Sequence, residues 1–130
     1  MLQKDYLADE SIETVYFGGG TPSLLSAYEL QSVLEKLQKT FAITSNAEIT
    51  LEANPDDLQA EKINELKQAG INRLSIGVQS FFTDDLEYLN RVHTAEQAKD
   101  CIKMAQDCGF ANLSIDLIYG IPGLSDEKWL

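Results

Sequence analysis

The chain has 130 residues, of which 44% are hydrophobic and 24% charged, a composition typical of one globular domain. With 10 Lys and Arg residues against 21 Asp and Glu residues, its formal net charge is −11. Such an acidic surface repels phosphate backbones and anionic lipids, so we expect no nucleic-acid partner and no membrane partner. No apolar run approaches the roughly 18 residues that a membrane span requires.

The N-terminal segment and the cysteines limit the class of protein further. Residues 1–10 contain no apolar segment, so we expect no signal peptide there. Cys101 and Cys108 are the only cysteines, which excludes a disulfide scaffold and favours a reducing, cytoplasmic setting. Their C-x6-C spacing matches no zinc or iron–sulfur motif, and Cys101 falls on the apolar stripe of a predicted helix. We therefore expect a buried thiol at Cys101 and no metal ligand in this chain.

Alternating apolar runs predict four β-strands in chain order. The strands are expected at Glu13–Gly18, Glu48–Ala53, Asn72–Gln79 and Asn112–Tyr119. Helical spacing fills the intervals, with capping boxes at Ser26 and Glu29 and at Thr94 and Gln97, and with Gly70 at one helix end. The helical segments are expected from Ser26 to Phe41, from Asp56 to Gly70, from Thr83 to Val92, over Thr94–Cys108, and from Ser125 onward. Four successive βα units with short connections predict parallel strands joined by right-handed crossovers.

Hydrophobic and polar residues alternate along the strands, whereas parallel strands covered on both faces are apolar throughout. The face expected under the helices carries Val15, Phe17, Ile49, Leu51, Leu74, Ile76, Val78, Leu113, Ile115 and Leu117. The opposite, polar face carries Tyr16, Gly18, Thr50, Glu52, Ser75, Gly77, Gln79, Ser114 and Asp116. The fold class predicted is therefore α/β: part of an open, TIM-like barrel of about four parallel βα units with a polar lumen.

Four units are half of an eightfold barrel, and the sequence stops inside a predicted helix. We therefore expect residues 1–130 to be one portion of a larger barrel domain, truncated at both ends. Sheet edges exposed in this way favour self-association.

Ligands in such folds bind at the carboxyl ends of the strands, and here all four ends are small, polar or acidic. Gly18-Gly19-Gly20 would let a ligand approach the main chain, or would simply form a tight turn. Asp116 is the strongest single candidate, since Ile115 and Leu117 flank it and an unpaired charge there would be costly.

Three other residues leave two interpretations open. Glu52 would bind an amine or a ribose hydroxyl, or be a solvated carboxylate, and Gln79 would contact a ligand or only line the lumen. Arg91 would bind a ligand carboxylate or lie at the surface beside a helix end. The only histidine, His93, is expected to be structural.

Four motifs occur in series: Tyr16–Ser23 (YFGGGTPS), Glu52–Pro55 (EANP), Leu74–Phe81 (LSIGVQSF) and Asp116–Gly123 (DLIYGIPG). Together they resemble the oxygen-independent coproporphyrinogen III oxidase family of radical S-adenosylmethionine (SAM) enzymes. The resemblance covers nearly the whole chain and implies a partial α/β barrel with a wide lumen. It also implies SAM contacts by Gly19, Gly20, Thr21, Glu52, Gln79, Arg91 and Asp116.

The resemblance implies a chemistry as well. In the family, a reduced [4Fe-4S] cluster cleaves SAM to a 5′-deoxyadenosyl radical. In the oxidase this radical takes hydrogen from the propionate side chains of coproporphyrinogen III, and loss of carbon dioxide leaves vinyl groups. The cluster is held by a C-x3-C-x2-C loop, which this chain lacks. We therefore expect the isolated chain to be inactive in radical chemistry and to bind SAM weakly.

Which member of the family the chain resembles most stays open at this point. Arg91–Thr94 and Val78–Phe81 look more like relatives that act as haem chaperones, so the small-molecule partner is a porphyrinogen or haem. Two other hypotheses remain: an unrelated barrel lyase or isomerase using Glu52 and Asp116 as acid and base, and a non-catalytic carrier. The lyase hypothesis lacks a Schiff-base lysine at a strand end.

Overall fold

Four parallel strands form one sheet in sequence order in the computed structural model, which describes residue 7 and residues 10–129. The strands are β1 (Ile12–Phe17), β2 (Ile43–Ala53), β3 (Arg73–Gln79) and β4 (Asn112–Leu117). The helices are η2 (Pro22–Leu24), α1 (Ala27–Gln38), η3 (Pro55–Asp57), α2 (Ala60–Gln68), α3 (Thr83–Tyr88), α4 (Ala95–Asp107) and α5 (Asp126–Trp129). This order confirms the predicted series of parallel βα units.

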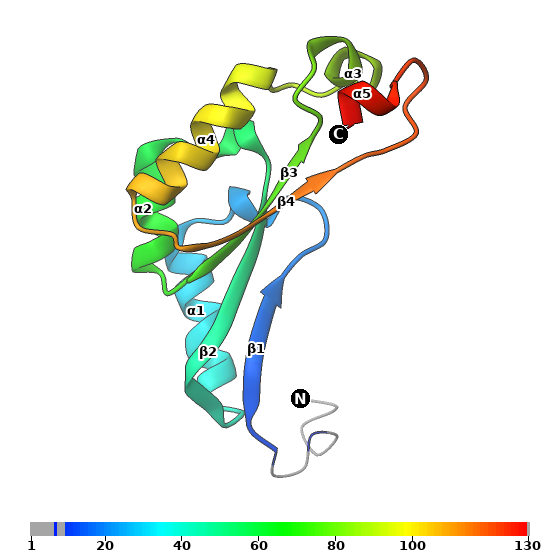
Figure 1. Cartoon of the computed structure of the whole chain (residues 1–130). Coiled ribbons are helices and arrows are strands. Elements are labelled where there is room, and N and C mark those ends of the chain that lie inside the picture. Colours follow the sequence, from blue (N-terminus) through cyan, green and yellow to red (C-terminus); the bar gives the residue numbers. More distant parts are fainter. Residues whose placement is uncertain (1–6, 8–9, 130) are drawn as a thin grey trace.

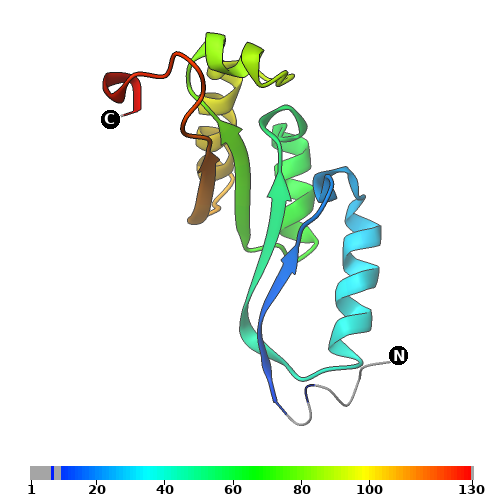
Figure 2. The same cartoon turned by 90° about the vertical axis from the view of Figure 1, so that its right-hand side faces the viewer.

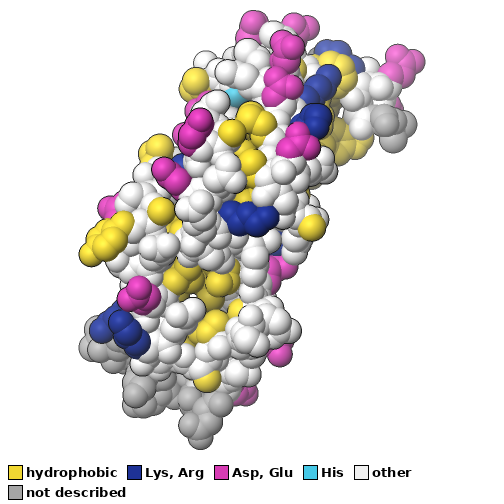
Figure 3. Space-filling view, turned by 90° about the vertical axis from the view of Figure 1, so that its left-hand side faces the viewer, with side chains coloured by type: hydrophobic (Ala, Val, Ile, Leu, Met, Phe, Trp, Pro, Cys, Tyr) yellow, Lys and Arg dark blue, Asp and Glu magenta, His cyan; other side chains and the backbone are white. Residues whose placement is uncertain are grey.

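The molecule has two layers. Helices α1, α2 and α4 lie on one face of the curved sheet, and the opposite face is left open by the described part of the chain (Figures 1 and 2). Helices α3 and α5 lie beyond the carboxyl ends of the strands (Figure 1). Acidic side chains are spread over the helix-covered face rather than gathered in one patch (Figure 3). None of the helices in residues 10–129 is both long and apolar enough to cross a membrane.

The hydrophobic core lies between the sheet and the three helices. Its strand members include Leu51, Leu74 and Ile76, which the alternation predicted, and Ala53, which it did not; Cys101 of α4 packs among them. Cys101 is a free thiol, and burial raises its pKa to about 11. The prediction of a buried thiol at this position is confirmed.

The apolar face of β4 differs from the prediction. Ile115 and Leu117 were expected beneath the helices, but each is 39% exposed, and only Leu113 packs against the core. The reason is topological: α5, the helix that follows β4, lies beyond the strand ends instead of against the sheet (Figure 1).

Element ends were predicted less well than element types. β2 begins at Ile43 rather than at Glu48, and β4 ends at Leu117 rather than at Tyr119. Asn72, expected to open the third strand, uses its side chain to accept from the Ile49 N–H (2.7 Å) and to donate to the Ala47 carbonyl (2.8 Å).

The helix expected to reach Val92 ends at Tyr88. Asn90 takes a positive φ of 52°, and the Arg91 N–H donates to the Leu86 carbonyl at 2.9 Å. This backbone pattern is a Schellman motif, which ends a helix with a left-handed residue. It directs residues 91–93 back across the carboxyl end of β3.

Candidate functional site

A glycine loop follows β1. Gly19 and Gly20 have φ values of 83° and 70°, which residues with a side chain rarely adopt. At neither glycine does another part of the chain come within 4 Å of the place where a Cβ would stand. The loop then enters η2, where the Ser23 hydroxyl donates to Asp57 of η3 at 2.7 Å. The loop is therefore anchored at its far end, and its glycine backbone is open to a ligand.

The Glu52 carboxylate ties the end of β1 to the end of β2. It accepts from the Tyr16 hydroxyl at 2.8 Å and from the Gly19 N–H at 3.1 Å. The hydrogen bond to Glu52 and, as a smaller cause, desolvation raise the pKa of Tyr16 above its ordinary value of 10.0. A Cβ on Gly18 would stand 2.7 Å from the Tyr16 ring and 3.0 Å from the Glu52 carboxylate. Only glycine at this position leaves that pair undisturbed.

A chain of hydrogen bonds follows the polar face of β3 and β4 to Asp116. The Arg73 guanidinium donates to the Ser114 hydroxyl (3.0 Å), which donates to the Ser75 hydroxyl (3.1 Å), which donates to Asp116 (3.3 Å). The Asp116 carboxylate is exposed and has a partner. The prediction that it projects from the strand as an unpaired charge is wrong, because Ser75 of the neighbouring strand lies in register with Ser114 and within reach of Asp116.

At the end of β3 the chain departs from a regular strand. Ile76 pairs with Ile115 and Gln79 with Leu117, so three steps along β3 match two along β4 and β3 contains one extra residue. Gln79 has a φ of 69°, a left-handed conformation that is unusual for a residue with a side chain. Its carboxamide folds back over Gly77, with Nε2 2.9 Å from the place where a Cβ on Gly77 would stand.

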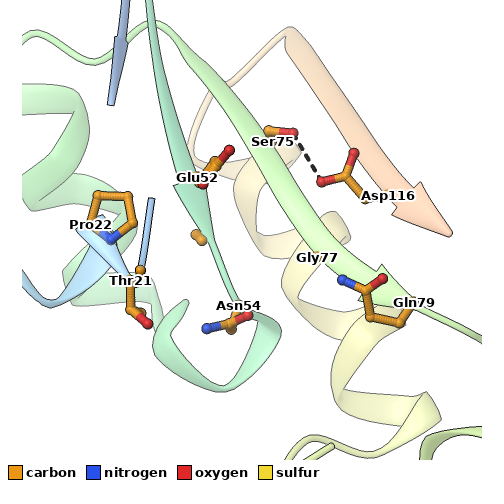
Figure 4. Close-up of a pocket in the computed structure, with 10 residues that line it drawn as sticks. Thr21, Pro22, Glu52, Asn54, Ser75, Gly77, Gln79 and Asp116 are labelled. Carbon is orange, nitrogen blue, oxygen red and sulfur yellow. Dashed lines mark hydrogen bonds between the residues drawn. The ribbon is translucent and has the colours of Figure 1, made fainter. Parts of the chain in front are cut away.

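These strand ends enclose a pocket of about 190 Å³ (Figure 4). Its lining residues are Gly20, Thr21, Pro22, Glu52, Ala53, Asn54, Ser75, Gly77, Gln79 and Asp116. Five of the seven predicted site residues thus lie around one cavity. Gly19 lines the adjoining pocket beside Tyr16.

Arg91 lies behind the pocket rather than in its wall. Its Nη2 atom donates to Asn54 Oδ1 at 2.8 Å and to the Gly77 carbonyl at 3.1 Å. Both of these partners line the cavity. The Nε atom of Arg91 is buried and has no hydrogen-bond partner among the described residues. Arg91 therefore supports the wall and keeps one donor unused.

Sequence reasoning missed three residues of the site. Ser75 and Tyr16 were placed on the polar face without a role, and Asn54 was noted only as part of the motif Glu52–Pro55. The alternation itself carried a signal for Ser75, which lies two residues before Gly77 on the same face. No local pattern could have indicated that Asn54 accepts from Arg91, since 37 residues separate them.

The amino-acid sequence of nearly the whole chain matches a known protein family. The Radical SAM superfamily profile matches residues 2–130, so the chain belongs to the radical SAM superfamily. This membership removes the alternative of an unrelated barrel lyase or isomerase.

Within the superfamily, the chain is similar to proteins named heme chaperone HemW. It is 39% identical to that of Escherichia coli over 125 residues, which cover 96% of this chain and 33% of the relative. It is 43% identical to that of Bacillus subtilis over 113 residues, which cover 86% and 30%. The chain therefore spans about a third of the length of these relatives.

A solved structure gives the same picture. The radical SAM enzyme coproporphyrinogen III oxidase (HemN) from Escherichia coli superposes with a TM-score of 0.84 at 30% identity. The superposition covers 98% of this chain and 30% of that one. This likeness confirms the predicted resemblance and the α/β, TIM-like barrel fold.

The two cofactors that the superfamily implies fit this chain differently. A SAM molecule carries an ammonium group, a carboxylate and ribose hydroxyls, and the pocket offers carboxylates, a carboxamide and open glycine backbone for them. A [4Fe-4S] cluster does not fit, because residues 10–129 contain no group of three His, Cys, Asp or Glu side chains able to hold a metal. Cys101 is buried in the core, and Cys108 follows α4.

Proposed function

We propose that the pocket at the strand ends binds SAM. The observation that carries this proposal is the convergence of the open Gly20 backbone with Glu52, Gln79 and Asp116, brought together from the ends of four successive strands. Glu52 and Asp116 would accept from the ammonium and ribose hydroxyl groups. Gln79 both donates and accepts, and the glycine loop would pack against the methionyl part.

Titration of SAM into the chain, with the binding heat measured by calorimetry, tests this proposal. Glu52→Ala and Asp116→Ala should each lower the affinity by roughly 1–3 kcal/mol, the cost of losing charged hydrogen bonds. Glu61→Ala, at an exposed position of α2, is the matched control and should bind like the wild type. Equal affinity in all four proteins would contradict the proposal.

We further propose that a protein with this site carries or acts on a tetrapyrrole, and we favour the haem chaperone over the oxidase. Support comes from the greater identity to proteins named heme chaperone HemW, 39% and 43%, than to the oxidase structure, 30%. Oxidative decarboxylation of coproporphyrinogen III is the second candidate. Any cluster would need ligands other than the residues described.

Haem and porphyrinogen distinguish these two candidates in a protein of the relatives' full length that contains this chain. Haem bound at one equivalent without consumption of SAM would support the chaperone. Conversion of coproporphyrinogen III with release of carbon dioxide would support the oxidase. A reducing, cytoplasmic setting and self-association through the sheet edges are also proposals, the first resting on the two free thiols.

A further inference from the structure

The carboxyl end of β3 has a conformation that local sequence does not favour. The Ser80 N–H donates to the Val78 carbonyl at 2.9 Å, closing a γ-turn around Gln79, whose φ is 69°. A γ-turn with positive φ is rare and strained, and this conformation raises the free energy of a residue that has a Cβ. Contacts from elsewhere in the chain must therefore stabilise it.

His93 makes such a contact. Its side chain is fully buried, and Nε2 lies 2.9 Å from the same Val78 carbonyl. Because a carbonyl only accepts, Nε2 carries the hydrogen and donates. Nδ1 has no hydrogen-bond partner among the described residues; the nearest acid, Asp56, lies 3.8 Å away, too far for a hydrogen bond.

Arg91, two residues before His93, binds the carbonyl group that precedes the Val78 carbonyl in β3. Its Nη2 atom donates to the Gly77 carbonyl at 3.1 Å. Two side chains of the loop after α3 thus bond to two consecutive carbonyls of β3, immediately before the γ-turn. The loop reaches this place because the Schellman motif at Asn90 ends α3.

We propose that His93 is a positioning residue for the pocket. By donating to the Val78 carbonyl it holds Gln79 in the left-handed conformation, which keeps the Gln79 carboxamide folded back over Gly77 and in the pocket wall (Figure 4). The consequence for ligand binding rests on the proposed SAM site. The conformational role does not, so the two can fail separately.

Two substitutions separate donation from the mere filling of space. His93→Gln keeps an N–H donor at the ε position, whereas His93→Leu keeps an apolar side chain of moderate volume and no donor. His93→Met replaces His93→Leu should the latter not fold. A residue that only fills the core would tolerate Leu or Met at least as well as Gln.

The first measurement is made on the full chain without ligand. The amide and α protons of one residue lie closest at positive φ, so a strong intraresidue NOE between them reports the Gln79 conformation. We expect this NOE to be strong in the wild type and in His93→Gln, and weakened in His93→Leu. A strong NOE in His93→Leu would overturn the proposal, and so would its loss in both variants.

The second measurement is SAM affinity. His93→Leu should weaken binding roughly two- to tenfold, the factor expected for one hydrogen bond, and His93→Gln should restore it. If the wild type binds SAM, unchanged affinity in His93→Leu would overturn the positioning role of His93. A wild type that binds no SAM would refute the proposed function, and the NOE pattern alone would then decide the role of His93.

Discussion

Glu52 organises the site in the absence of a ligand. It accepts from Tyr16 and from the Gly19 N–H, so the carboxylate expected to bind SAM also shapes the glycine loop. Two accepted bonds leave a carboxylate with further lone pairs, since it has about four acceptor positions. Replacement of Glu52 is therefore expected to disturb both the loop and the ligand contacts.

Gly77 is the residue that lets the Gln79 carboxamide fold back into the pocket. In Gly77→Ala the new Cβ would stand 2.9 Å from Gln79 Nε2, 3.5 Å from Asn54 Oδ1 and 3.6 Å from Arg91 Nη2. The closest atom is the end of a flexible side chain, so we expect Gln79 to move and SAM affinity to fall severalfold, with the free energy of unfolding changed by less than about 1 kcal/mol.

Gly70→Ala is the matched contrast, because Gly70 has a φ of 102° and lies outside the pocket. It should destabilise the fold by about 1–2 kcal/mol and leave the SAM affinity unchanged. Urea unfolding and calorimetry measure both quantities. A loss of affinity in Gly70→Ala as large as in Gly77→Ala would contradict this assignment.

At the scale of the element, the helices begin where short-range chemistry places them. The capping boxes predicted at Ser26 and at Thr94 are both present, each with its reciprocal pair of hydrogen bonds. In the first, hydrogen bonds from the Ser26 backbone and hydroxyl lower the pKa of Glu29. These bonds span three residues, so no tertiary contact is needed to form them.

Ser26→Ala should lower the free energy of unfolding by about 1 kcal/mol at neutral pH. Since folding depresses the pKa of Glu29, its contribution is present above the unfolded value of 4.5 and is lost as the pH falls through the folded value. The difference between wild type and Ser26→Ala should therefore shrink in acid. Urea unfolding from pH 7 to pH 3 checks this, with Ser45→Ala, at an exposed position of β2, as a control. A difference independent of pH would exclude the Glu29 contribution.

The end of α3 shows an element that sequence periodicity describes poorly. The apolar spacing continues to Val92, but Asn90 turns the chain back at a positive φ. Asn adopts this conformation more readily than most residues, and the bonds from Asn90 and Arg91 to Glu87 and Leu86 then satisfy the last carbonyls. The turn carries Arg91 and His93 to the end of β3.

At the scale of the whole molecule, one buried thiol reports on the packing of sheet against helices. Cys101 lies in the core between α4 and β3, and desolvation raises its pKa from 9.0 to about 11. Because the folded pKa exceeds the unfolded one, the contribution to stability is complete below pH 9 and is lost as the pH rises towards about 11.

The free energy of unfolding, measured in urea from pH 7 to pH 10.5, should thus fall more in the wild type than in Cys101→Ala. Alkylation gives a second test, since Cys108 is half-buried and should react before Cys101 in the folded chain. Equal rates of alkylation, or parallel pH profiles in the two proteins, would show that the core is open around Cys101.

The open polar face of the sheet is also a property of the whole molecule. Tyr16 contacts Glu52 across the β1–β2 pair, and Ser75 contacts Asp116 across the β3–β4 pair, from residues as far as 41 positions apart. Those contacts depend on strand register, which places Glu52 opposite Ser75 and Ser75 opposite Ser114. The pocket exists only once all four strands are paired.

What the sequence determined by itself was local and periodic. The alternation of period two identified the strands and their polar face, the capping boxes placed the starts of α1 and α4, and the series of four motifs indicated the family. Each of these signals arises within a few neighbouring residues, where backbone geometry dictates which side chains share a face.

Only the tertiary structure decided how the polar groups are partnered. It gave Asp116 a hydrogen bond from Ser75, placed Arg91 behind the pocket wall, left Ile115 and Leu117 exposed, and inserted the extra residue before Gln79. The physical reason is that a hydrogen bond needs its two atoms within about 3 Å. For residues tens of positions apart, strand register and loop path set that distance, and local propensity does not.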